Sequence, residues 1–159
     1  MGVAQPITFQ DKVTEISATA LYPIGTKRYE VDSNGLMACY QYCQADDALT
    51  QYDAVAIDIA ASAVGLKVTR AATAGQRILG FTQVAVTDEY YFWLQRGGVM
   101  SATMKTGVAA GDPVTGTSTA GACGQATEAG SGAYKFAQFT AITANSSGAD
   151  ATRVVFGMI

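Results

Sequence analysis

The chain contains no histidine among its 159 residues. Without histidine, neither a Ser-His-Asp triad nor a Cys-His nucleophile pair can form, and the side chain best suited to proton transfer near neutral pH is missing. Metal sites built on histidine are excluded for the same reason. The sequence therefore argues against much ordinary enzyme chemistry, and we expect a protein that is not an enzyme.

Charge is also scarce, because Asp, Glu, Lys and Arg make up 14% of the chain, against roughly 25% in an average soluble domain. Ten basic residues are scattered singly along the sequence against thirteen acidic ones, which gives a net charge of −3. No basic stripe is present to neutralise a phosphate backbone, so we do not expect direct nucleic-acid binding. A surface so poor in charge is typical of proteins with broad, symmetric subunit contacts.

Cysteines are few, and Cys39, Cys43 and Cys123 cannot all pair within one chain. On a strand, Cys39 and Cys43 would lie on one face about 13 Å apart, too far for a disulfide. We expect three reduced, partly buried cysteines in a protein made in a reducing cytoplasm, without a secretion signal. A CxxC-type spacing and a fourth ligand are missing, so we expect no metal site and no cofactor.

Apolar runs are short, and none approaches the length of a membrane span. Four aspartates could serve as ligands for a hard cation, calcium or magnesium, but their spacing does not follow that of an EF-hand loop. Surface aspartates beside a strand are far commoner than a cation site. The four are Asp46, Asp47, Asp53 and Asp58.

Alternation of apolar and polar residues recurs at roughly ten-residue spacing between turns, which is typical of strands. No segment carries an apolar helical stripe over three turns. The pattern predicts an all-β barrel or sandwich, with a hairpin across the turn at 32–35 and a bulge or close backbone approach at Gly80. The predicted strands are 27–31, 36–43, 54–60, 64–70, 77–86, 90–98, 134–143 and 152–159.

One of these strands is densely aromatic, and its bulky side chains point both ways. Tyr91 and Trp93 should face one side, while Phe92 and Leu94 face the other. Bulk on both faces predicts a central strand that is buried on two sides or lies at a subunit boundary. These four residues are therefore candidates for the core or for a subunit interface.

Two further segments, the N-terminal residues and a long tract of small residues, also carry a prediction. Residues 1–20 follow no sustained period and predict an extended N-terminal arm ahead of one β-barrel-type domain over 21–159, or of two small β-modules that share one core. Residues 106–132 are mostly Gly, Ala, Thr and Ser, and predict a loop region with a turn at 111–113.

The order of turns and strand starts resembles the small capsid decoration, or cement, proteins of tailed bacteriophages, over most of residues 22–159. The segments that carry this resemblance are Pro23-Ile24-Gly25-Thr26, Asp32-Ser33-Asn34-Gly35, Tyr40-Gln41-Tyr42, Ala74-Gly75-Gln76, Gly80, Tyr91-Phe92-Trp93-Leu94-Gln95, Gly98, Ala109-Ala110-Gly111-Asp112-Pro113-Val114 and Thr119-Ala120-Gly121. These are turns and strand starts, with no catalytic signature among them.

The resemblance implies a fold such as a β-tulip or related barrel, and a homotrimer on the outer face of an icosahedral head. Such proteins sit at threefold or quasi-threefold positions of the expanded shell and resist the outward pressure of packaged DNA. The expected partner is the major capsid protein, and the expected location is the virion surface after synthesis in the host cytoplasm.

In that role, the N-terminal arm would add a strand to an exposed sheet edge of the major capsid protein. Its capsid-binding residues would be Val3, Pro6, Ile7 and Phe9, with Ile7 and Phe9 as the main anchors. The residues of the aromatic strand, Tyr91, Phe92, Trp93 and Leu94, would lie in the core or at the trimer interface.

Two other functions stay open at this point. The first is a carbohydrate- or receptor-binding β-module of a viral fibre or surface structure, with residues 90–93 as its platform. The second is an enzyme that uses carboxylates alone, as glycosidases do. The glutamates are dispersed in the sequence, which disfavours the second: they are Glu15, Glu30, Glu89 and Glu128.

Overall fold

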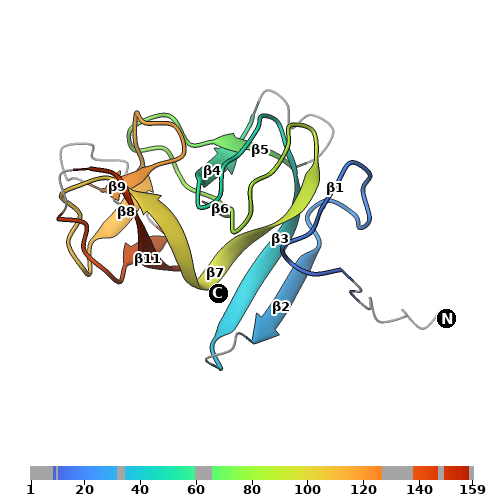
Figure 1. Ribbon diagram of the computed structural model, residues 1–159, viewed down its shortest axis with the longest axis horizontal. Coiled ribbons are helices and arrows are strands. Elements are labelled where there is room, and N and C mark those ends of the chain that lie inside the picture. Colours follow the sequence, from blue (N-terminus) through green and yellow to red (C-terminus); the bar gives the residue numbers. More distant parts are fainter. Residues whose placement is uncertain are drawn as a thin grey trace.

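The computed structural model describes Phe9 and residues 11–31, 35–59, 66–126, 138–146 and 149–157. Over these residues the protein is all-β without a helix, and its strands form one large mixed sheet, which confirms the predicted fold class (Figure 1). The strands are β1 (Ile16–Ser17), β2 (Lys27–Val31), β3 (Met37–Ala45), β4 (Ala54–Ile57), β5 (Lys67–Arg70), β6 (Gly80–Phe81), β7 (Tyr91–Met104), β8 (Pro113–Gly116), β9 (Cys123–Gln125), β10 (Phe139–Ala141) and β11 (Ala151–Gly157).

The strand pairings close two barrel-like rings, and the long strand β7 belongs to both. The first ring runs β7-β6-β4-β5-β3 and is closed by antiparallel pairing of β3 with β7. The second ring runs β7-β9-β8-β10-β11 and is closed by antiparallel pairing of β11 with β7. Figure 1 shows β7 passing from one ring to the other and changing direction between them.

Gly98 lies where the pairing of β7 passes from β3 to β11. Its φ of +86° is in the left-handed region that glycine accepts most readily. A Cβ atom at this position would collide with the carbonyl oxygen of Met37 on β3. Glycine therefore allows both this backbone conformation and the close approach of β7 to β3.

Each ring encloses its own cluster of buried apolar side chains. The first cluster is Cys43, Ala45, Leu49, Val55, Val68, Leu79, Val86, Phe92 and Leu94. The second cluster is Ala54, Ala56, Ala71, Ile78, Phe81, Met100, Ala102, Met104, Val108, Val114, Cys123, Phe139, Ala141 and Val155. Strand β4 lies between them, because Val55 belongs to the first cluster while Ala54 and Ala56 belong to the second.

The predicted two-sided burial of the aromatic strand is confirmed. Phe92 and Leu94 belong to the first cluster, and Trp93, which points to the opposite face, is also fully buried. Tyr91 is half-buried at the start of the strand. The three cysteines are free and buried, as expected.

The prediction of a loop region over 106–132 was wrong in its middle part. Strands β8 and β9 lie there and pair with each other, and Val114 and Cys123 are buried. Small residues hide this strand signal, because Gly, Ala and Thr give little alternation in hydrophobicity. The turn at 111–113 is confirmed: Gly111 has a φ of +91°, and the Ala109 amide donates to Asp112 Oδ2 at 2.8 Å.

The predicted strand over 77–86 was also too long, since only Gly80–Phe81 is paired as a strand there. The predicted close approach is confirmed, because a Cβ on Gly80 would collide with the carbonyl oxygen of Gln95 on β7. The contact between the two backbones brings β6 against β7. Among the described residues, no helix has the length and apolar character needed to cross a membrane.

Candidate functional site

The aromatic residues singled out in the sequence gather on the outer face of β3 and β7. Trp93 is the centre of this aromatic cluster, with ring centroids 5.0 Å from Tyr42, 5.3 Å from Phe9 and 5.4 Å from Tyr22. Tyr91 stacks on Tyr42 at 6.1 Å. The cluster joins the long strands to the N-terminal segment of the chain.

Asp11 completes the cluster with a buried carboxylate. It accepts hydrogen bonds of 2.6 Å from both the Trp93 indole Nε1 and the Tyr22 hydroxyl, and Arg28 lies 3.6 Å away. Burial alone would raise the pKa of Asp11, but the hydrogen bonds from Tyr22 and Trp93 and the charge of Arg28 outweigh it, so the pKa is lowered. The carboxylate therefore stays ionised in its pocket.

The described part of the expected arm lies against the domain. Phe9 contacts Trp93, and the Arg28 guanidinium lies 4.9 Å from the Phe9 ring centroid. Strand β1 pairs with β7 through Ile16 and Phe92. The other three expected capsid contacts, Val3, Pro6 and Ile7, lie outside the described residues.

Two rings of the sugar-stacking platform expected at residues 90–93 are not accessible. Phe92 and Trp93 are fully buried, and the Trp93 ring is surrounded by other aromatic rings. A carbohydrate site needs an exposed ring face, which Phe92 and Trp93 do not offer, while Tyr90 and Tyr91 are half-buried.

The aspartates considered as cation ligands have other partners. Asp46 pairs with Lys67 and Asp47 with Arg70, while Asp53 accepts hydrogen bonds from the amide and hydroxyl of Thr50. Within the described ranges, no three Cys, Asp or Glu side chains are grouped as a metal site would require.

Two of the described glutamates that were considered for glycoside hydrolysis are engaged in ion pairs. Glu30 binds Arg28 and Glu89 binds Lys67, while Glu15 is exposed in the N-terminal segment. Glu128 lies outside the described residues.

Two exposed surfaces were not predicted from the sequence as binding sites. The first is the β2–β3 hairpin, which projects from the body of the molecule (Figure 1). The register pairs Val31 with Met37 and Tyr29 with Cys39, so these side chains share one face. Tyr29 is 55% exposed, Val31 67% and Met37 51%. We call Tyr29, Val31 and Met37 the hairpin face.

The hairpin also has an open edge. Strand β2 is the last strand of the sheet, and among the described strands it pairs only with β3. An edge strand presents unpaired backbone N–H and C=O groups, which can bind a strand of another chain. An exposed apolar face beside an open edge is typical of a protein-binding surface.

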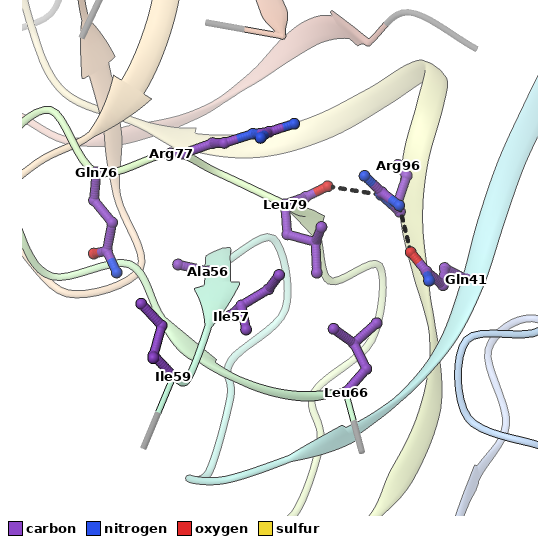
Figure 2. A pocket seen from close by; sticks show the side chains of 9 residues that line it. All are labelled: Gln41, Ala56, Ile57, Ile59, Leu66, Gln76, Arg77, Leu79 and Arg96. Atoms are coloured by element: carbon purple, nitrogen blue, oxygen red, sulfur yellow. Dashed lines mark hydrogen bonds between the residues drawn. The ribbon is translucent and has the colours of Figure 1, made fainter. Parts of the chain in front are cut away.

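The second surface is a pocket of about 510 Å³ at the open end of the first ring (Figure 2). We call it the ring mouth. It is lined by Gln41, Ala56, Ile57, Ile59, Leu66, Gln76, Arg77, Leu79 and Arg96. Inside it, Arg96 donates from Nε to the Leu79 carbonyl at 3.2 Å and from Nη1 to the Gln41 amide oxygen.

Comparison with protein families and with curated proteins does not identify the chain. No protein-family model matches the chain, and no curated protein matches it.

Proposed function

We propose that this protein is a structural virion protein that binds, as a trimer, to the outer surface of an icosahedral phage head. There it occupies threefold or quasi-threefold sites and stabilises the expanded shell against the pressure of packaged DNA. The sequence resemblance to decoration proteins supports this proposal. The structural observation that carries it furthest is the projecting hairpin with an apolar face and an open edge.

Binding, and not chemistry, is the function that this hairpin suits. The hairpin face is more than half exposed at each of its residues, Tyr29, Val31 and Met37. Burial of each of these side chains would be favourable, because it removes apolar surface from water. Full burial of a side chain of this kind contributes about 1.5–3 kcal/mol. A partner that covers the hairpin face would recover part of that free energy, and pairing along β2 would add main-chain hydrogen bonds.

A trimer would multiply this effect. Each copy presents one hairpin, so a threefold assembly can engage the shell at three points. Once the first contact has formed, the other two are effectively intramolecular, and weak single contacts add up to strong attachment where the geometry allows all three. Such a trimer would hold neighbouring capsomers together by binding free energy alone.

Sedimentation with purified expanded heads tests the proposal. Val31→Asp places a charge on the hairpin face and is expected to weaken head binding at least tenfold without lowering the melting temperature. Ile142→Asp is the control, because Ile142 is also an exposed apolar residue (44%) but follows β10 in the second ring. Equal binding by wild type and Val31→Asp, or no binding by wild type, would contradict the proposal.

A further inference from the structure

We infer that the ring mouth is a binding site for an apolar carboxylate, that is, an acid group carried on an aliphatic or aromatic body. This inference is independent of the proposed role on a phage head. It rests on two features of the open end of the first ring. The inward-facing residues there form a pocket, and the charged residues that line this pocket are both arginines.

The wall of the ring mouth continues the interior of the first ring. Along β7, Phe92 and Leu94 point into the first cluster, and Arg96 is the next residue of that alternation. On β4 the same step leads from buried Val55 to Ile57, which is 42% exposed. The barrel-like interior is thus apolar at depth and opens to solvent at this end, a common location for small-ligand sites.

The same alternation holds on the other strands. On β3, Gln41 precedes Cys43 of the first cluster by two residues, and beside β5, Leu66 precedes buried Val68 by two residues. The pocket volume of about 510 Å³ lies within the range of roughly 300–1,000 Å³ that is usual for small-molecule sites. The ring mouth is therefore large enough for a compact apolar group.

The charges of the ring mouth are all of one sign. Arg77 and Arg96 line it, and no acidic residue does. Among the described residues, neither arginine forms an ion pair, although four other basic side chains do: Arg28, Lys67, Arg70 and Lys105. Two uncompensated guanidinium groups in a chain of net charge −3 leave a place for an anion.

Arg96 is already oriented for this task. Its bonds to the Leu79 carbonyl and the Gln41 amide hold the side chain while using two of its five N–H donors. The remaining donors suit the planar, two-oxygen geometry of a carboxylate. Figure 2 shows both arginines on the upper side of the pocket, above Ile57 and Leu66. The acid group of a ligand would contact the arginines, and its apolar body would contact the aliphatic side chains.

The same chemistry occurs in two sources, a free amphiphilic acid and a glutamate flanked by apolar residues in a peptide. The experiment therefore has two arms. The first titrates the protein with octanoate, octanol and octyltrimethylammonium. The second uses the peptides acetyl-Leu-Glu-Leu-amide and acetyl-Leu-Gln-Leu-amide, and both arms follow binding by NMR chemical shifts and calorimetry.

We expect at least one of the two acids to bind saturably, and at least tenfold more tightly than its uncharged counterpart. Arg77→Gln and Arg96→Gln are each expected to reduce this preference at least threefold. Arg153→Gln is the control, because Arg153 lies on β11 in the second ring and should leave the preference unchanged. The arm that binds identifies the source.

Two results would overturn the inference. One is the absence of saturable binding by both acids, and the other is an unchanged preference for the acid in the arginine variants. If Arg96→Gln lowers the melting temperature, Arg77→Gln decides alone, because Arg77 is exposed and makes no described hydrogen bond or ion pair whose loss would disturb the fold.

Discussion

The indole Nε1 of Trp93 donates a 2.6 Å hydrogen bond to Asp11 Oδ2, across 82 residues of sequence. This bond joins the N-terminal segment to the strand that both rings share. Because the same carboxylate also accepts from Tyr22 and faces Arg28, it satisfies polar groups from three parts of the chain in a buried place. The aromatic cluster is thus held together by one ionised side chain.

Replacing this carboxylate should destabilise the fold. Asp11→Asn keeps the shape of the side chain but removes the charge that accepts two hydrogen bonds, and the expected loss is about 1.5–3 kcal/mol of unfolding free energy. Asp88→Asn is the control, since Asp88 is exposed and should change stability by less than about 0.5 kcal/mol. Urea unfolding monitored by Trp93 fluorescence measures both, and equal midpoints would contradict the role given to Asp11.

The lowered pKa of Asp11 predicts how stability depends on pH. A carboxyl group with a folded pKa below its ordinary value of 3.8 stabilises the fold above that value, and the contribution is lost as pH falls through the folded pKa. Below about pH 4, wild type should therefore lose stability faster than Asp11→Asn. Parallel stability curves for the two proteins in acid would show that Asp11 is not the group responsible.

Trp93 itself should be among the costliest residues to truncate. Its side chain is fully buried and packs against several aromatic rings, so Trp93→Ala is expected to cost about 3–5 kcal/mol. Phe156→Ala is a suitable comparison, because Phe156 is 43% exposed on β11. Similar melting temperatures for Trp93→Ala and wild type would mean that the aromatic cluster does not support the fold.

Gly80 should tolerate no side chain. A Cβ atom there would collide with the Gln95 backbone, which cannot move aside as a flexible side chain can. We expect Gly80→Ala to lower the free energy of unfolding more than Gly107→Ala does. At Gly107, φ is +89° but the space is open, so the expected loss of unfolding free energy is about 1–2 kcal/mol from backbone strain alone. The midpoints of chemical unfolding give the order, and the reverse order would contradict the close approach of β6 and β7.

The buried cysteines should be inert. Burial raises the pKa of both Cys43 and Cys123 to about 12, so almost no thiolate forms at pH 8. Ellman's reagent is expected to label neither Cys43 nor Cys123 in the native protein and all three cysteines of the chain in guanidinium chloride, while an exposed control, Ser118→Cys, reacts at once. Rapid native labelling of Cys43 or Cys123 would show that the ring interiors open readily.

The same thiols predict a loss of stability in alkali. Because the folded pKa lies above the ordinary value, the neutral thiol is favoured in the fold, and its contribution is complete below about pH 9. It is lost as pH rises from there towards about 12.

Bulky residues made part of this fold predictable from sequence. The alternation from Tyr91 to Leu94 predicted a strand buried on both faces, and the hairpin appears with its first strand at 27–31 as predicted. Strands β8 and β9 escaped prediction because Val114 and Cys123 are surrounded by Gly, Ala and Thr, whose small side chains carry almost no alternation. Their pairing is set by the ring that encloses them, which is tertiary information.

The candidate surfaces were harder to predict for a related reason. Alternation in β2 separates Tyr29 and Val31 from Arg28 and Glu30, but it does not say which face is covered. The structure shows that the charged face lies against Asp11 while the apolar face is open. The ring mouth likewise brings together residues from strands far apart in sequence, which only the closed pairing of β3 with β7 places side by side.

The proposed function requires that a phage encodes this chain, and its most direct test is quantitative mass spectrometry of that phage's purified virions. A head decoration protein present at most threefold sites should be found at a copy number comparable with that of the major capsid protein. It should also be released as a trimer when the heads are gently dissociated. Near-absence of the chain from such virions would contradict the account.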